Sequence, residues 1–252
     1  MSVNAHLPHL HRYSAAAATG RAPGQYTRQL VLRMRMRALL TLGLFAVFTV
    51  LVGRFVGFDH VIFEVAEVAL LCACLGVTRY VLPVVERYDR GAQGEEYVGS
   101  ILEELRNDGW LVIHDAELEY SNVDHIVLGP AGLFTIETKS NPGPISVQRL
   151  HGRLIRQVHL QKERVEKLVD APAEPLLVYS RARVDRPGRR RKGIRVLEAD
   201  MLPGFLEEHP ASLSDERVTE LRERLLAAFV PEPGRVRWAR AERLAPAPKP
   251  QP

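Results

Sequence analysis

An uncharged apolar run near the amino-terminal end constrains this 252-residue chain more than any other feature. Residues 38–53 (ALLTLGLFAVFTVLVG) contain no charged side chain, and the three arginines within residues 33–37 stop where the run begins. If Arg54 extends its guanidinium to the interface, the run continues to Phe58 and provides about the 20 residues that a bilayer-crossing helix needs. The pattern therefore predicts a transmembrane helix over about residues 38–58.

A second apolar run covers residues 61–85 and contains Glu64, Glu67 and Arg79. These charges lie toward the ends of the run, where an ionised group costs less than the roughly 3 kcal/mol that it costs at the bilayer centre. We therefore predict a second transmembrane helix over these residues. Two alternatives stay open, which are a single span and a pair of helices buried in a soluble core.

The distribution of arginine predicts the orientation of this anchor. Arginines precede the first run and end or follow the second, at Arg79, Arg87 and Arg90, whereas the connection holds Arg54 against Asp59. Cytoplasmic flanks of membrane spans are enriched in basic residues. The anchor is thus expected to be a multi-pass helical hairpin in the cell membrane, with both termini and the following domain in the cytoplasm.

Composition divides the chain into four parts. Residues 1–27 lack periodicity and are expected to be a disordered tail, and residues 28–88 contain the anchor. Residues 89–231 form the folded domain, and residues 232–252 are a basic, Pro/Ala-rich tail that is also expected to be disordered. The net charge of +4 permits contact with nucleic acid or with an anionic membrane.

Periodicity within the folded domain alternates between helical and strand patterns. The spacing of Val98, Leu102 and Leu105 predicts an amphipathic helix, and Ser214 is a good N-cap for a closing helix. This alternation predicts an α/β fold. Helices are expected over residues 94–109, 157–169 and 215–229, strands over 110–114, 123–128, 133–138, 176–179 and 194–197, and a small hairpin over 145–147 and 153–156.

The hairpin over residues 123–138 brings charged side chains together. Its register puts Asp124 directly opposite Glu137 on one face, with Lys139 two residues further on. Glu95 falls on the apolar stripe of the preceding helix, which is expected to pack above them. Like charges opposite one another destabilise a strand pair, so the two carboxylates need a cation or a proton between them.

Two interpretations of this cluster stay open on spacing alone. Asp124 and Glu137 can bind Mg²⁺ or Mn²⁺ together with water and a substrate phosphate, while Lys139 stabilises developing negative charge. That arrangement suits the hydrolysis of a phosphodiester. In the second interpretation, Lys139 only neutralises Glu137 in a cross-strand salt bridge on a solvated face.

Two segments, GAQGEEYVGSILEEL and NVDHIVLGPAGLFTIETKSNPGPI, resemble the NERD (nuclease-related) domain, a branch of the PD-(D/E)xK nuclease superfamily. The resemblance covers most of residues 90–230 and is weaker in the later part. It implies a restriction-endonuclease-like core, with a central mixed sheet flanked by helices, and a divalent metal as cofactor. A glutamine that supports the family's site corresponds to Gln157, with Gln161 as the alternative.

The resemblance also implies roles for the acidic residues and the lysine. Glu95 matches the acid of the family's first helix, and Asp124 matches the metal-binding aspartate. Glu137 and Lys139 match the E-x-K pair.

Other polar residues are assigned simpler roles. His125 points to the opposite strand face from Asp124 and is expected to be a packed core residue. Asp115 and Glu117 are expected in a solvated loop. The basic run over residues 181–195 is expected to be a hairpin tip that grips nucleic-acid phosphates, or else an exposed loop or a contact to anionic lipid headgroups. Its candidate nucleic-acid-binding residues are Arg181, Arg183, Arg189, Arg190, Arg191 and Lys192.

These features predict a membrane-anchored, Mg²⁺-dependent nuclease that hydrolyses phosphodiester bonds at the cytoplasmic face, with DNA favoured over RNA as substrate. The expected catalytic residues are Glu95, Asp124, Glu137, Lys139 and Gln157. A second hypothesis is a catalytically inactive module of the same fold that binds nucleic acid or a protein partner at the membrane. A third is a membrane-proximal structural or sensory protein in which the anchor is the working part.

Overall fold

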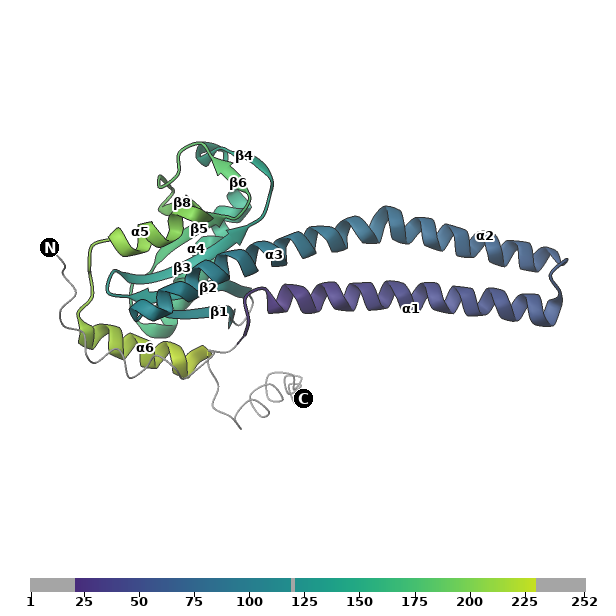
Figure 1. Ribbon diagram of the computed structural model, residues 1–252, viewed down its shortest axis with the longest axis horizontal. Coiled ribbons are helices and arrows are strands. Elements are labelled where there is room, and N and C mark those ends of the chain that lie inside the picture. The colour runs from purple at the N-terminus through teal and green to yellow at the C-terminus, as the bar shows by residue number, and fades with distance from the viewer. Residues whose placement is uncertain (1–20, 119–120, 230–252) are drawn as a thin grey trace, which may run out of the picture.

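The computed structural model describes residues 21–118 and 121–229. An α/β domain lies at one end, and a long pair of antiparallel helices extends from it as a rod (Figure 1). The first helix of the rod is α1 (Gln25–Val56). The second consists of α2 (Val61–Gly76), a π-helical turn (Val77–Val81) and α3 (Leu82–Glu104), which follow one another without a break.

Pro83 accounts for the π-helical turn inside the second helix of the rod. Proline has no N–H to donate, and its ring clashes with the carbonyl four residues earlier, here that of Arg79. Widening the preceding turn relieves this clash. Thr78 stabilises the wider turn, because its Oγ1 donates to the carbonyl oxygens of Cys74 and Leu75 at 3.0 Å each.

Both helices of the rod are long and apolar enough to cross a membrane. Only 17% of the apolar window in α1 and 6% of that in the second helix are buried. The domain therefore does not cover them as it would cover the core helices of a soluble fold. Large exposed side chains on the rod include Leu44, Phe48, Val65 and Leu71.

The domain is built on a six-stranded mixed sheet with the strand order β1-β2-β3-β5-β8-β7. The first three strands are antiparallel, whereas β3, β5 and β8 run parallel. The bounds are β1 Leu111–Leu118, β2 Ser121–Gly129, β3 Gly132–Lys139, β5 Glu174–Tyr179, β7 Arg190–Arg191 and β8 Ile194–Glu198. A separate parallel pair consists of β4 (Gly143–Ile145) and β6 (Ala182–Val184).

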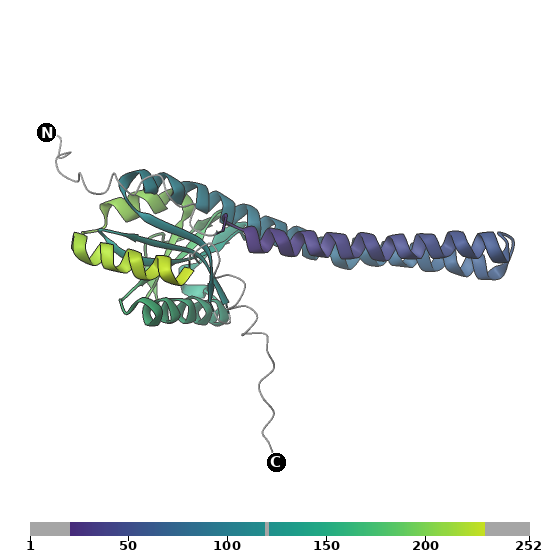
Figure 2. The same cartoon turned by 90° about the horizontal axis from the view of Figure 1, so that it is seen from below.

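Helices cover both faces of the sheet (Figure 2). One face packs against α3 and α5 (Leu202–Glu208), where Leu102 and Leu206 join Phe134 in the core. The other face packs against α4 (Gly152–Val169) and α6 (Asp215–Phe229). Short 3₁₀ turns lie at Leu105–Asp108, Val147–Arg149 and Ala199–Met201. This arrangement confirms the α/β class with a mixed sheet.

The central hairpin and the closing helix are as expected from the sequence. Leu128 pairs with Leu133, so the register of β2 and β3 is the predicted one. Gly132 has a φ of 140°, which explains why glycine closes this turn. At the start of α6, the Ser214 Oγ accepts a hydrogen bond from the backbone N–H of Arg217 at 3.3 Å.

The predicted small hairpin over residues 145–147 and 153–156 is wrong. β4 pairs with the distant strand β6, and residues 153–156 lie in the first turns of α4. The His151 Nδ1 begins this helix by accepting the backbone N–H of Arg153 at 3.2 Å. Ile155 and Val158 lie three positions apart and are both buried, which is a helical spacing.

The basic run is not the tip of a hairpin between β5 and β8, because those two strands are parallel. The run instead crosses over from the end of one strand to the start of the next. Tight turns in the run occur at Pro187 and Gly188, where the backbone N–H of Arg189 donates to the Arg186 carbonyl oxygen at 3.3 Å, and between β7 and β8, where Lys192 and Gly193 have φ values of 48° and 81°.

Two predicted boundaries also differ from the structure. Helix α1 begins at Gln25, inside the segment that was expected to be a tail, and residues 21–27 contact the domain. The expected division at residues 88/89 falls within α3, because no strong helix breaker occurs there. Residues 1–20 of the first predicted tail and the whole second predicted tail, residues 232–252, lie outside the described residues.

Candidate active site

Three strands place three carboxylates in a row across the sheet. On β1 and β2, His114 pairs with His125 and Ala116 with Val123, so Asp115 lies opposite Asp124. The register of β2 and β3 continues from His125–Ile136 to bring Asp124 opposite Glu137. A hydrogen bond of 2.7 Å from the backbone N–H of Thr138 to the Asp124 Oδ2 holds this end of the hairpin together.

Glu137 is the most enclosed of these carboxylates, with a side chain only 3% exposed. Its Oε1 accepts hydrogen bonds from the Lys139 Nζ and, at 2.7 Å, from the Gln157 Nε2. Its Oε2 accepts from the Gln161 Nε2 at 2.7 Å. Both glutamines that the sequence proposed as alternatives reach Glu137, because they are four residues apart on one face of α4. Gln161 also donates to the carbonyl oxygen of Asn122 at 2.7 Å.

Glu95 approaches this row from α3. Burial, together with the nearby charges of Asp115 and Glu137, raises the pKa of Glu95 from an ordinary value of 4.5 to about 7. The helix comes this close because residue 94 is glycine, since a Cβ there would overlap the Oγ atoms of Ser140 and Ser180.

The charges in the cluster do not balance. Burial, then Glu137 and Glu95, raise the pKa of Asp124 well above its ordinary value. Burial alone would lower the pKa of Lys139, but the surrounding carboxylates, with Glu137 first, outweigh it and raise that pKa. Lys139 therefore stays charged, and one ammonium group faces several carboxylates that repel one another.

Asp115 belongs to this cluster and not to a solvated loop, contrary to the sequence prediction. Its φ of 47° bends β1 locally, and the residue is 4% exposed. Burial raises its pKa, and its Oδ2 accepts the backbone N–H of Tyr26 at 3.0 Å. The sequence signal for Asp115 is its register opposite Asp124. Glu117 is exposed as expected and pairs with Arg21 at 2.6 Å.

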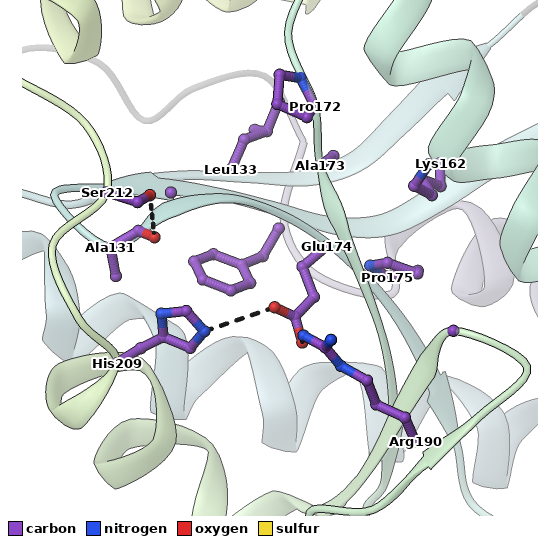
Figure 3. Close-up of a pocket in the computed structure, with 13 residues that line it drawn as sticks. Ala131, Leu133, Lys162, Pro172, Ala173, Glu174, Pro175, Arg190, His209 and Ser212 are labelled. Carbon is purple, nitrogen blue, oxygen red and sulfur yellow. Dashed lines mark hydrogen bonds and ion pairs between the residues drawn. The ribbon is translucent and has the colours of Figure 1, made fainter.

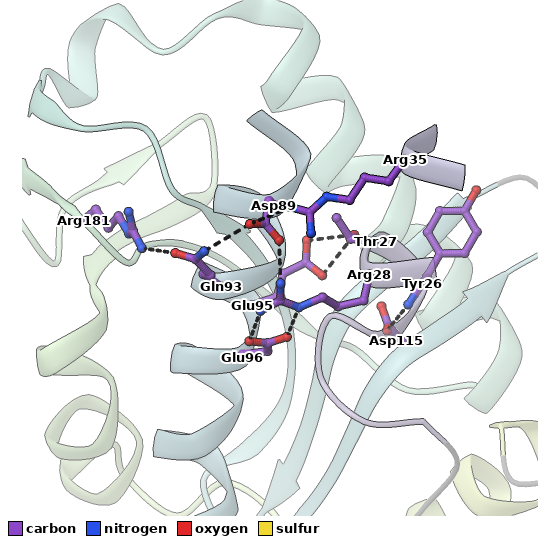
Figure 4. A network of polar contacts seen from close by, with 10 residues as sticks. All are labelled: Tyr26, Thr27, Arg28, Arg35, Asp89, Gln93, Glu95, Glu96, Asp115 and Arg181. Carbon is purple, nitrogen blue, oxygen red and sulfur yellow. Dashed lines mark hydrogen bonds and ion pairs between the residues drawn. The ribbon is translucent and has the colours of Figure 1, made fainter. Parts of the chain in front are cut away.

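The segment that begins α1 forms one wall of the site (Figure 4). The Thr27 Oγ1 lies 3.3 and 3.4 Å from the two carboxylate oxygens of Glu95. Arg28 binds Asp89 and Glu96 on α3 at 2.5 Å each. No sequence pattern indicated these contacts, because they join residues more than sixty positions apart.

His125 is a packed core residue, as expected. It is fully buried, and its Nδ1 lies 2.7 Å from the Nδ1 of His114, whose Nε2 contacts the Glu103 Oε1 at 2.6 Å. Burial lowers the pKa of both histidines. They lie on the α3 face of the sheet, whereas Glu137 faces α4.

The basic run does not form a single patch. Arg181 follows β5 at the end of the sheet that holds Lys139, and Arg183 is exposed on β6. At the other end, Arg190 pairs with Glu174 at 2.9 Å and Arg191 donates to Gln148 at 3.2 Å. Lys192 lies in the β7–β8 turn, and Arg189 precedes β7.

A hollow of about 370 Å³ opens at that other end of the sheet (Figure 3). Glu174 lies in it and is balanced by Arg195 at 2.7 Å, Arg190 at 2.9 Å and His209 at 3.5 Å. Glu174 is opposite Phe134 on β3, three residues before Glu137. This hollow is therefore separate from the carboxylate cluster, and its acid is already neutralised.

Within the part of the chain that the structure describes, no three His, Cys, Asp or Glu side chains converge closely enough to hold a metal by themselves. The cluster is nevertheless compatible with a hard cation that uses few protein ligands. Mg²⁺ is typically held by one or two carboxylates and keeps several waters. Asp124 and Glu137, adjacent and crowded by like charge, are oxygen donors of this kind.

Comparisons with known proteins place a family match on this part of the chain. Residues 90–181 match the family model described as "Nuclease-related domain" (NERD), and this range includes the whole carboxylate cluster. No curated protein matches the chain. A solved structure of SfsA from Pyrococcus furiosus in complex with Ca²⁺ is 16% identical and has a TM-score of 0.23. The alignment covers 56% of this chain and 53% of that one, so the match spans about half of SfsA and carries no argument about fold or function.

Proposed function

Residues 90–181 form a nuclease-related domain, and from this premise we propose that the chain is a membrane-anchored, Mg²⁺-dependent nuclease with a restriction-endonuclease-like core. The proposed reaction is hydrolysis of a phosphodiester bond in DNA or RNA at the cytoplasmic face.

The observation that carries the proposal is the excess of carboxylates around Lys139. A salt bridge, such as that between Lys139 and Glu137 on β3, needs one carboxylate for one ammonium group. Here Glu137 contacts Lys139, while its charge, after burial, also helps to raise the pKa of both Glu95 and Asp124. Crowded carboxylates of this kind are costly to keep and are common where chemistry requires them.

Asp124 and Glu137 would hold the metal. Bound there, Mg²⁺ or Mn²⁺ would stabilise negative charge on a phosphate oxygen and lower the pKa of a coordinated water. Gln157 and Gln161 orient the Glu137 carboxylate from α4. Lys139 keeps its positive charge and would stabilise negative charge that develops on the phosphate.

Glu95 fits the role of a general base. With a pKa of about 7, its carboxyl group is divided between the protonated and the ionised form near neutral pH. A group of this kind can accept a proton from an attacking water and release it again. Its hydrogen bond with Thr27 fixes the carboxylate relative to α1.

Membrane anchoring is supported by the exposed apolar rod and by arginines at the domain end of both helices. Arg33, Arg35 and Arg37 precede the apolar part of α1, and Arg87 and Arg90 follow that of the second helix. These flanks favour a cytoplasmic position for the domain.

The test uses the full chain in dodecyl maltoside, because Thr27 and α3 belong to both the anchor and the site. Mg²⁺ and Mn²⁺ are titrated by calorimetry, and cleavage is measured with single- and double-stranded DNA and RNA. Asp124→Asn and Glu137→Gln should each lower cleavage by about 100-fold or more and remove metal binding. Asp108→Asn, at an exposed carboxylate outside the cluster, should behave as the unaltered chain.

A second candidate function is a catalytically inactive module that binds nucleic acid. The contacts of Lys139, Gln157 and Gln161 with Glu137 favour it, because they neutralise that carboxylate without a metal. Nucleic-acid binding by the full chain without metal binding or cleavage would identify this function. A chain that neither binds nor cleaves nucleic acid would contradict both.

A further inference from the structure

A hollow of about 280 Å³ lies next to the carboxylate cluster, at the carboxyl ends of β3 and β5. Ligands of open α/β sheets bind outside the carboxyl ends of parallel strands. The hollow is lined by Gln93, Gly94, Tyr97, Ser180 and Arg181.

The hollow and the cluster share a wall. The backbone N–H of Ser180 donates to the carbonyl oxygen of Lys139 at 2.9 Å, and the Oγ atoms of Ser180 and Ser140 are 3.0 Å apart. On the helix side, Gly94 lines the hollow while Glu95, the next residue, faces the carboxylates. A nucleic-acid strand bound at the cluster would therefore place its next nucleotide in this hollow.

Arg181 brings positive charge to the hollow. It is exposed, and its Nη2 donates to the Gln93 Oε1 at 2.6 Å (Figure 4). Among the described residues no carboxylate forms an ion pair with it, whereas Arg190 in the same basic run is paired with Glu174. Its remaining N–H groups keep the fork geometry that suits a phosphate.

Outside the carboxylate cluster, the two acidic residues that bond to side chains lining the hollow are already engaged. Asp89, which accepts from the Gln93 Nε2 at 3.4 Å, is bound by Arg28 at 2.5 Å and by Arg35 at 3.5 Å. The Asp200 Oδ1 accepts a hydrogen bond of 2.7 Å from the Tyr97 hydroxyl. An incoming anion would meet these paired groups and the unpaired charge of Arg181.

We propose that this hollow binds the backbone phosphate of a nucleic-acid strand next to the phosphate that is cleaved. Arg181 makes the charged contact, and Ser180 and Gln93 supply hydrogen bonds. The assignment rests on the proposed function and narrows it, because it selects Arg181 from the basic run as the phosphate-binding residue beside the site.

The experiment measures binding of a fluorescent single-stranded DNA 12-mer to the full chain in dodecyl maltoside with EDTA, so that neither cleavage nor lipid phosphate interferes. Arg181→Gln should lower the affinity by about 3- to 10-fold and reduce the slope of log affinity against log salt by about 0.7, the contribution of one single-strand phosphate contact. Arg181→Lys should keep the slope while losing part of the affinity. Lys167→Gln is the matched control, since Lys167 is exposed in the last turn of α4, shortly before the start of β5 and so at the opposite end of the sheet from the hollow.

A second arm uses 12-mers that carry one neutral methylphosphonate at successive positions. At one position the unaltered chain should lose affinity while Arg181→Gln does not. Equal binding by Arg181→Gln, Lys167→Gln and the unaltered chain would overturn the subsite and leave the nuclease proposal standing. Failure of the unaltered chain both to bind and to cleave nucleic acid would overturn the two together.

Discussion

At the scale of single residues, Glu95 shows how the environment of a carboxyl group sets its chemistry. Its neighbour Glu96 lies one position along the same helix and binds Arg28, which lowers the pKa of Glu96. Glu95 instead faces Asp115 and Glu137 in a buried position, and its pKa is about 7. Two adjacent glutamates therefore differ in charge near neutral pH because one is paired with a cation and the other with carboxylates.

This raised pKa predicts a dependence of stability on pH. The folded state holds the Glu95 proton more tightly than the unfolded chain does, so the stabilising contribution is complete below about pH 4.5 and is lost as the pH rises through about 7. Glu95→Gln should raise the Tm at pH 8.5 by about 3 °C or more and change it little at pH 4. Thermal unfolding of the full chain measures this, with Glu104→Gln, at an exposed position of the same helix, as the control. A lower Tm for Glu95→Gln at both pH values would contradict it.

Thr27 predicts a shift in the pH profile of activity. Its hydrogen bond lowers the pKa of Glu95, so Thr27→Val should raise that pKa further. If Glu95 must be ionised to act as the base, the pH of half-maximal cleavage should move upward by about half a unit. Thr219→Val, on the exposed side of α6, should leave the profile unchanged. A profile that does not move in Thr27→Val would show that Thr27 has no part in positioning Glu95.

At the scale of elements, the sequence predicted those that depend on local pattern. The β2–β3 hairpin, its register and helix α6 follow from alternation, turn residues and an N-cap, all of which are local signals. The pairing of β4 with β6 joins segments almost forty residues apart, and no local pattern distinguishes it from a small hairpin. The place of Asp115 in the cluster depends on the pairing of β1 with β2 and on its contact with Tyr26, which join residues that are not neighbours in the sequence.

Gly94 and Gly91 provide a matched comparison within α3. A Cβ at residue 94 would overlap Ser140 and Ser180, whereas a Cβ at residue 91 would have nothing within 4 Å. Gly94→Ala should therefore lower the free energy of unfolding by about 1–3 kcal/mol and reduce cleavage, because the helix must move away from β3. Gly91→Ala should raise it by up to about 1 kcal/mol through helix propensity. Chemical denaturation of both variants in dodecyl maltoside measures these free energies of unfolding. Equal changes in Gly94→Ala and Gly91→Ala would show that close packing at Gly94 is unimportant.

At the scale of the whole molecule, the start of α1 is part of the domain as well as part of the rod. Arg28 binds Asp89 and Glu96, and Pro23 occupies the space that a side chain at Gly99 would need. Asp115 accepts a backbone N–H in the first turn of α1, where a carboxylate is favourable. Each of the two helices of the rod is thus fixed to the domain at the end that lies nearest to the domain.

These contacts predict the behaviour of the docked segment. Arg28→Gln removes two ion pairs, and amide hydrogen exchange in residues 22–28 should become faster while that of β3 stays unchanged. The loss of stability should be about 1 kcal/mol or less, because the Arg28 side chain is 42% exposed. Arg33→Gln serves as the control, because the Arg33 Nε donates to the carbonyl oxygen of Gln29 within the same helix. Equal exchange in the two variants would mean that Arg28 does not hold α1 to the domain.

The unbroken passage of the second helix into the domain also sets a clearance between the site and the bilayer. In the proposed membrane arrangement, ten residues separate Val85 from Glu95 on one helix and Arg37 from Thr27 on the other, and each interval is about 15 Å long. Because α3 runs away from the membrane and β3 runs back toward it, the carboxyl ends of the parallel strands face the lipid headgroups. A nucleic-acid strand that reaches Lys139 must therefore lie along the membrane surface, in a gap about as deep as three helical turns.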